Sequence, residues 1–163
     1  MRKILVALFA SFLAVVLAAC GGQTQQPAET PEAPAGTEVA PGIFQSDLPQ
    51  GGYKLVCEEP VSGTVNVTIT LEEGQSLVVF GQLEQGEGEV PQSHDGEWMM
   101  TDYLYEGNSI SSMDYDPGDY DVEFNLTDAQ GTVYVFPYAT GEIDFENMDA
   151  DEIATVLLEY LGE

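Results

Sequence analysis

The sequence has very few basic residues. Among its 163 residues there are 29 Asp and Glu but only three Lys and Arg, which gives a formal net charge of −26. Arg2 and Lys3 stand at the start of the chain, so Lys54 is the one cation in the remainder. A surface this acidic repels both nucleic-acid phosphates and anionic lipid headgroups. Nucleic-acid binding is therefore excluded.

Histidine and cysteine are also scarce. The chain has one histidine, His94, and two cysteines, Cys20 and Cys57. These are too few ligands for a zinc site, and a Ser-His-Asp arrangement would depend on His94 within the turn-rich segment PQSHDGEW (91–98). Paired carboxylates are the remaining route to catalysis, because acids are abundant. We therefore expect a non-catalytic protein, with a small carboxylate-dependent hydrolase as an alternative.

The first 20 residues follow the pattern of a bacterial export signal. MRK (1–3) is basic and the next 16 residues (4–19) are apolar apart from Ser11, as in a secretory signal peptide. The segment LAAC (17–20) resembles the lipobox of bacterial lipoproteins. That resemblance implies cleavage before Cys20 and attachment of a diacylglyceryl group to its sulfur, and two or three acyl chains bind a membrane stably. The expected location is the extracytoplasmic face of the cell membrane or the outer membrane, with the membrane as partner.

A segment rich in Pro, Gln, Thr, Ala and Glu follows the lipobox. Residues 21–42 contain no aromatic residue, and Val39 is their only sizeable apolar side chain. This composition cannot bury enough apolar surface to offset the entropy lost on ordering. We therefore predict four segments: a signal peptide (1–19), the lipidated Cys20 with a disordered tether (20–44), an acidic β-sandwich (45–141), and a C-terminal helical segment packed on it (142–163).

Short runs of alternating apolar and polar residues begin near Ile43. GTVNVTITL (63–71) has an apolar residue at every second position, and SLVVFGQL (76–83) and GTVYVFPY (131–138) are further strand-like runs. In DYDVEFNL (119–126) the apolar side chains alternate with acids, which favours a strand with one face toward water. About seven short strands without a long helix between them predict an all-β fold, an antiparallel two-sheet sandwich.

One motif within this pattern resembles a known family. Asp116, Gly118, Tyr120 and Val122 are similar to the Asp-x-Gly-x-Tyr-x-Cys element of immunoglobulin-like sandwiches. The resemblance implies that the Tyr120 hydroxyl bonds back across the corner, and Val122 replaces the cysteine of the inter-sheet disulfide. VTITLEEGQSLVV (67–79) is similar to the early strands of bacterial pre-peptidase C-terminal-like domains. We therefore predict an immunoglobulin-like sandwich.

The acids around the same turn form a candidate calcium site. Calcium takes six to eight oxygen ligands, and Asp114, Asp116 and Asp119 lie close together in sequence. The EF-hand spacing is missing, because Asp119 stands where that loop has its glycine. Two interpretations stay open: a calcium site on these three residues, or a solvated acidic surface without a ligand.

NMDADEIATVLLEYLGE (147–163) is the one clear helical segment. Asp149 and Glu152 have the spacing of a capping box, and Gly162 is a stop signal. The apolar stripe of the predicted helix consists of Ile153, Val156, Leu157, Tyr160 and Leu161. We expect this short amphipathic helix to cover the sandwich, with a partner-docking helix as the alternative.

The run from Trp98 to Tyr105 holds the candidate ligand-binding residues. Tyr103 and Tyr105 fall on one strand face, and aromatic rings beside carboxylates are typical of sugar-binding surfaces. We expect Trp98, in contrast, to lie in the core.

The sequence thus predicts a lipid-anchored envelope protein with a binding or structural role. The alternative is a calcium- or carbohydrate-dependent adhesion module. An envelope protein or a glycan is the expected partner, and calcium is the candidate cofactor.

Overall fold

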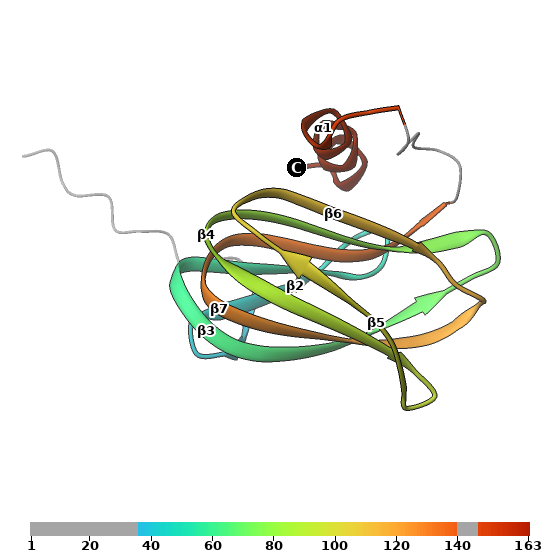
Figure 1. The fold of residues 1–163 in the computed structure, drawn as a ribbon, viewed down its shortest axis with the longest axis horizontal. Coiled ribbons are helices and arrows are strands. Elements are labelled where there is room, and N and C mark those ends of the chain that lie inside the picture. The colour runs from blue at the N-terminus through green and yellow to red at the C-terminus, as the bar shows by residue number, and fades with distance from the viewer. Residues whose placement is uncertain (1–35, 140–146) are drawn as a thin grey trace, which may run out of the picture. The chain divides into compact units, whose positions relative to one another are not determined.

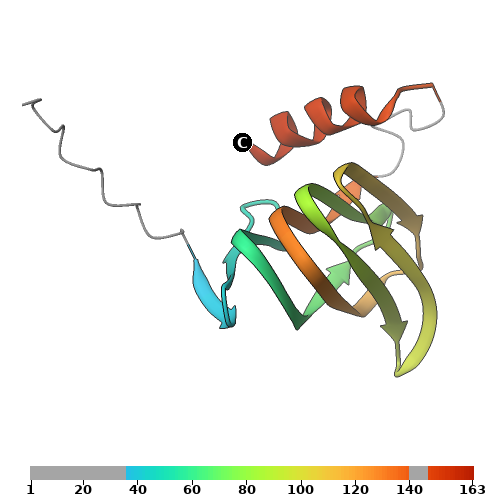
Figure 2. The ribbon, with the colours of Figure 1, turned by 60° about the vertical axis from the view of Figure 1, so that its left-hand side comes forward.

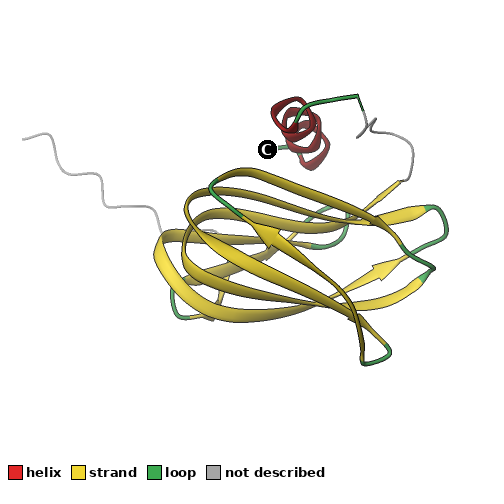
Figure 3. Cartoon of the chain, viewed as in Figure 1, coloured by secondary structure: helices red, strands yellow, loops and turns green. Residues whose placement is uncertain are grey.

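The structure is a computed structural model of the chain that describes residues 36–139 and 147–163. The described part is built from strands and one helix (Figures 1 and 3). Their bounds are β1 Thr37–Ala40, β2 Ile43–Asp47, β3 Tyr53–Leu71, β4 Gln75–His94, β5 Glu97–Leu104, β6 Gly107–Asp114, β7 Gly118–Ala139 and α1 Ala150–Leu161. All pairs between these strands are antiparallel. The predicted all-β class with a short C-terminal helix is confirmed.

The strands form one continuous sheet in the order β1-β2-β3-β7-β4-β5, and β6 pairs with β4. β3, β4 and β7 are 19, 20 and 22 residues long, and the register shifts near the middle of each. At this corner Gly86 has a φ of 83°, and a Cβ there would lie 2.3 Å from the carbonyl oxygen of Asp128. Only glycine fits, as is common where a bulge bends a sheet.

The corner divides the sheet into two halves. The helix-side half consists of β1, β2, β6 and the parts of the long strands at 53–57, 75–83 and 131–139. The open half consists of β5 and the parts at 63–71, 87–94 and 118–127. β6 and β5 pair with successive parts of the same edge of β4, because β7 occupies its other edge. The folded sheet thus supplies the two layers of a sandwich-like fold (Figure 2).

The main core lies between the two halves. Leu55 and Val135 from the helix-side half pack in one cluster with Val67, Val122 and Phe124 from the open half. Side chains of a strand alternate between its faces, so the period-two pattern of the open half places its apolar residues inward. The acids and threonines of the same strands face solvent. The sequence pattern therefore determines which face of the open half is buried.

A second core lies on the other face of the helix-side half, where α1 covers the sheet (Figure 2). Val78, Phe80 and Phe136 of the sheet pack with Leu157 of the helix. Residues 76–81 are all buried, because successive side chains enter one core or the other. A strand buried on both faces loses the polar alternation and becomes a continuous apolar run.

The ends of α1 follow the capping signals. The Asp149 carboxylate accepts a bond from the Glu152 backbone N–H at 2.9 Å, and the Glu152 carboxylate accepts one from the Asp149 N–H at 3.2 Å. Gly162 ends the helix in the left-handed conformation with a φ of 77°. The predicted capping box and the predicted stop are both confirmed.

Polar contacts fasten α1 to the sheet at both ends. Asn108 donates to the Asp151 carboxylate at 2.9 Å near the first turn. Lys54 forms an ion pair with Glu163 at 2.5 Å just past the last turn, and its ammonium lies over the Tyr134 ring. The sole lysine of the described residues is thus used to hold the helix. No helix in the described residues is long and apolar enough to cross a membrane.

β1 lies within the segment predicted to be a tether. Thr37 pairs with Gln45 of β2, so strand pairing begins at residue 37, within the predicted tether (20–44), rather than after it. The β1 side chains are exposed or half-buried, so its sequence lacks the apolar alternation that would reveal a strand. Backbone pairing along an edge leaves no such pattern. The predicted signal peptide (1–19), the lipidated Cys20 and the tether up to residue 35 lie outside the described residues.

Candidate functional site

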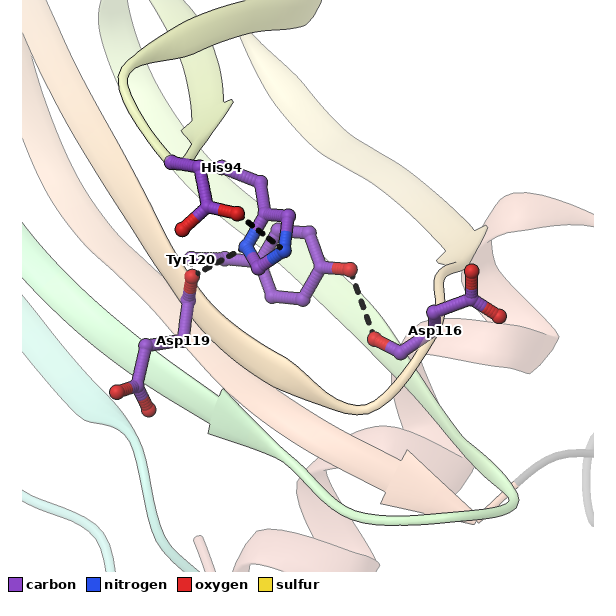
Figure 4. A network of polar contacts seen from close by, with 5 residues as sticks. His94, Asp116, Asp119 and Tyr120 are labelled. Carbon is purple, nitrogen blue, oxygen red and sulfur yellow. Dashed lines mark hydrogen bonds and ion pairs between the residues drawn. The ribbon is translucent and has the colours of Figure 1, made fainter.

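Tyr120 forms the corner that its sequence motif implies. Its hydroxyl donates a 2.7 Å hydrogen bond to the carbonyl oxygen of Asp116 (Figure 4). The ring is buried and stacks between His94 and Tyr115, with ring centroids at 4.7 and 4.8 Å. A Cβ at Gly118 would meet the His94 ring at 2.9 Å, so glycine leaves the space for this stack. The corner joins the turn before β7 to the end of β4.

A chain of hydrogen bonds continues from this corner into the interior. The Tyr115 hydroxyl donates to Gln92 Oε1 at 2.9 Å, and Gln92 Nε2 donates to Asp102 Oδ2 at 2.5 Å. Ser111 Oγ donates to the other oxygen of Asp102 at 2.8 Å. Gln92 is fully buried and Asp102 is 8% exposed. Buried polar groups are stable when their bonds are made, and both carboxylate oxygens of Asp102 accept one. Asp102 has no cationic partner among the described residues.

The electrostatics of the corner keep its tyrosines neutral. Burial raises the pKa of Tyr115, and the negative charge of Asp102 raises it further. Burial likewise raises the pKa of Tyr120, with Asp116 adding to the shift. Both hydroxyls therefore remain protonated near neutral pH and act as donors. Neither tyrosine is therefore a reactive phenolate near neutral pH.

His94 belongs to the same cluster. Its Nδ1 lies 2.8 Å from the carbonyl oxygen of Asp119, which can only accept, so the hydrogen is on Nδ1 (Figure 4). Nε2 lies 3.6 Å from the Asp95 carboxylate. Asp95 has a φ of 52° and Gly96 one of 79°, which makes the two-residue turn between β4 and β5. The segment around His94 is thus a hairpin, and its histidine packs on Tyr120.

The three candidate calcium ligands have separate partners. Asp114 accepts a bond from Ser76 at 2.5 Å, and Asp119 accepts one from Thr70 at 2.7 Å. Asp116 contributes its backbone carbonyl to the Tyr120 corner. The part of the chain that the structure describes contains no group of three or more His, Cys, Asp or Glu side chains arranged to hold a metal ion. The calcium site stays a prediction without geometric support.

An exposed row of aromatic residues is the main surface feature of the open half. Trp98, Tyr103 and Tyr105, which we call the aromatic edge, are 66%, 52% and 58% exposed. Met99 and Met100 between them are exposed as well. The prediction that Trp98 lies in the core is wrong: a register shift at Gln92–Ser93 pairs Trp98 with Ser93, which places its side chain on the outer face.

A depression of about 400 Å³ adjoins this edge. Tyr103 and Tyr105 form one side, with ring centroids 6.4 Å apart and an interplanar angle of 19°. The polar side chains of the depression are Glu87, Glu89, Asn125 and Thr127. The structure therefore brings the two predicted ligand-binding tyrosines together and adds hydrogen-bonding groups from β4 and β7.

No protein-family model matches this chain, and a search of the curated proteins finds no match either.

Sequence reasoning missed the buried polar residues near Tyr120 and the polar residues of the depression. Gln92 and Asp102 stand at inward positions of β4 and β5, and a polar residue in register with apolar ones signals a buried bond. Asp95-Gly96 between two strand-like runs is a hairpin signal that would have placed His94 at a strand end. Glu89 and Asn125 carry no local signal, because only strand pairing brings them beside Tyr103.

Proposed function

We propose that this protein is a lipid-anchored, non-catalytic binding module on the extracytoplasmic face of a bacterial membrane, and that it binds through the aromatic edge. The anchor rests on the resemblance of LAAC (17–20) to a lipobox. The binding role rests on one feature of the fold: three large rings are exposed on β5 and on the residue that follows it.

The composition of β5 supports a binding role. Sheets ordinarily protect an edge strand with charges, proline or short length. β5 is eight residues long and pairs only with β4 among the described residues, yet it exposes Trp98, Met99, Met100 and Tyr103. Contiguous exposed apolar side chains on a soluble domain are characteristic of interaction sites. The exposed apolar row contrasts with the acidic composition of the chain, which has 29 Asp and Glu residues.

The state of Asp102 and His94 supports a non-catalytic role. A general acid or base must reach the proton that it transfers. Asp102 is buried with both oxygens bonded to neighbours, and the His94 ring is stacked on Tyr120. These groups serve the corner and the interior.

Metabolic labelling with palmitate tests the anchor. The full chain expressed in a bacterial host should incorporate label and sediment with membranes, and Cys20→Ala should abolish both. A chain that stays unlabelled and remains in the soluble fraction contradicts the anchor.

Sedimentation with isolated cell envelopes tests the binding role. The protein purified in detergent should bind envelopes saturably, and the double variant Trp98→Ala, Tyr103→Ala should lose most of this binding. Val39→Ala, an exposed apolar residue of β1 on the opposite edge, is the matched control and should bind normally. Saturable binding that the double variant retains contradicts the assignment to the aromatic edge.

A further inference from the structure

The outer face of the open half carries two transverse rows of side chains. Directly opposed residues of neighbouring strands project from the same face, so the register assigns the rows. One row reads Thr68, Asp121, Ser93 and Trp98, and the other reads Thr64, Asn125, Glu89 and Tyr103. Each row thus runs from a threonine through polar groups to an aromatic ring. The two rows are four residues apart on β4, or about 13 Å.

The second row is fixed in place by its own hydrogen bonds. Thr64 Oγ1 donates to Asn125 Oδ1 at 2.8 Å, and Asn125 Nδ2 donates to Glu123 at 2.9 Å. The carboxylates of Glu87 and Glu89 have no ion-pair partner among the described residues. The depression therefore combines a rigid amide with two carboxylates that are available to accept bonds from a ligand.

Resting on the proposed function, we infer that this face binds a neutral polysaccharide. The flat faces of pyranose rings carry C–H groups that pack on aromatic rings, and Tyr103, Tyr105 and Trp98 offer exposed rings for this contact. Sugar hydroxyls donate to carboxylates, which are acceptors only. The depression of about 400 Å³ lies within the range of roughly 300–1,000 Å³ that small-ligand sites occupy.

The charge of the molecule selects among glycans. The chain after Lys3 carries 29 acids against Lys54 alone, a formal charge of −28, and Glu87, Glu89 and Asp121 lie on or beside the site. Uronic acid polymers and other polyanions are repelled by such a surface. The ligand is an uncharged chain of sugars that spans from the depression at Tyr103 toward Trp98.

An added peptide strand fits the arrangement less well. A strand that pairs with the edge of β5 contacts the backbone of β5 and lies on its outer side. Glu89 on β4 and Asn125 on β7 are then about 5 and 10 Å farther away across the sheet. A ligand on the face of the sheet contacts the rings and the polar groups together, which an edge strand does not.

Affinity electrophoresis tests the inference. The full chain, purified in a detergent without a sugar headgroup, is run in native gels that contain hydroxyethyl cellulose, laminarin, glycogen or glycol chitin. Its high negative charge gives a fast reference mobility, so retardation by a bound polymer is easily measured. We expect at least one of these neutral polymers to retard the protein, and polygalacturonate to leave its mobility unchanged.

Variants assign the binding to the face. Trp98→Ala and Tyr103→Ala should each weaken binding by roughly tenfold, as expected when a stacked ring is lost. Val39→Ala should bind normally, and unchanged melting temperatures would show that all three variants are folded. All three substitutions are at exposed positions outside the core.

Three results would overturn the inference. These are no retardation by any of the four neutral polymers, retardation by polygalacturonate at least as strong as by any of them, or equal retardation of the unaltered chain and both ring variants. Saturable binding to envelopes without binding to any neutral polymer would leave the proposed function intact while rejecting a glycan as the ligand. An extended basic peptide that then competes with envelopes would identify strand addition at β5 as the mode of binding.

Discussion

Tyr120 occupies a position where a single hydroxyl group closes the turn before β7. Tyr120→Phe keeps the ring stacked on His94 and Tyr115 and removes only the bond to the Asp116 carbonyl. Asp116 is exposed, so its carbonyl can bond to water in the variant. We expect the free energy of unfolding to fall by about 1 kcal/mol, measured by urea denaturation.

Tyr103→Phe is the matched control for this prediction. Tyr103 is 52% exposed on the aromatic edge, and its ring stacks on Tyr105. Removal of its hydroxyl should leave the unfolding free energy unchanged within error. If Tyr120→Phe were as stable as Tyr103→Phe, the corner bond would contribute nothing to stability.

Two other buried groups predict how stability responds to alkaline pH. Burial raises the pKa of the Cys57 thiol from 9.0 to about 11. Burial, with a smaller effect of Glu163, raises the pKa of Tyr134 from 10.0 to about 12. The unfolded chain therefore ionises first as pH rises. The stability from both groups is complete below pH 9 and is lost as pH rises toward about 12.

Denaturation at a series of pH values measures this loss. The unfolding free energy should fall with a slope of up to about 1.4 kcal/mol per pH unit for each group that titrates. Tyr134→Phe should show a shallower slope above pH 10 than Tyr103→Phe, because it removes one of the groups whose pKa burial raises in the folded chain. Equal slopes in the two variants would mean that Tyr134 titrates alike in the folded and unfolded chains.

Tyr120 and Trp98 show which features of a site are local enough to predict from the sequence. The donor and acceptor of the Tyr120 corner are four residues apart, so a short motif contains the whole interaction. The exposure of Trp98 depends instead on a register shift between β4 and β5. Its large apolar side chain gives no sign of that shift. Burial of an isolated aromatic residue is therefore a property of strand pairing, which the sequence pattern does not contain.

At the scale of elements, α1 is joined to the sheet through one face. Leu157 is fully buried in the second core, whereas Glu159 on the same helix is exposed. Leu157→Ala should lower the free energy of unfolding by about 3 kcal/mol, because it leaves a cavity against the sheet. Glu159→Ala should change it by less than about 0.5 kcal/mol. Chemical denaturation of both variants measures the difference.

Hydrogen exchange distinguishes whether α1 unfolds together with the sheet or separately from it. If α1 is part of the folded unit, Leu157→Ala should speed exchange of the amides in α1 and in the strand residues beneath it, including Phe80 and Phe136. An unchanged unfolding midpoint, with faster exchange in α1 alone, would indicate a helix that contributes little to the sheet. That result would favour a helix whose main partner is another protein.

The elements also divide into those that the sequence predicts and those that it does not. The outward threonines and acids of β3 and β7 alternate with apolar residues, so their strands and inward faces were predictable. The bend at Gly86 was not, because each long strand continues through it with a shifted register. β1 was also missed, since exposed side chains and backbone pairing leave no periodic pattern. The single folded sheet follows from long-range pairing rather than from any one segment.

At the scale of the whole molecule, like charges repel one another across the surface. The chain after Lys3 has a formal charge of −28, and the Lys54–Glu163 pair is the one ion pair formed by lysine among the described residues. The folded state gathers these carboxylates more closely than the unfolded chain does. Self-repulsion of this kind destabilises a compact state and is screened by salt.

We therefore expect NaCl to raise the melting temperature by several degrees, since about 1 kcal/mol corresponds to roughly 4 °C for a domain of this size. The Debye length falls from about 10 Å at 0.1 M to about 3 Å at 1 M, so most of the rise should occur at low salt if screening causes it. Glu73→Gln and Glu84→Gln remove exposed charges and should raise the melting temperature at low salt while reducing the response. Differential scanning calorimetry measures both, and a flat response up to 1 M would contradict self-repulsion.

Comparison of CaCl₂ with MgCl₂ at equal ionic strength tests the predicted calcium site. Screening alone predicts equal shifts of the melting temperature, whereas a specific site predicts a larger shift for calcium.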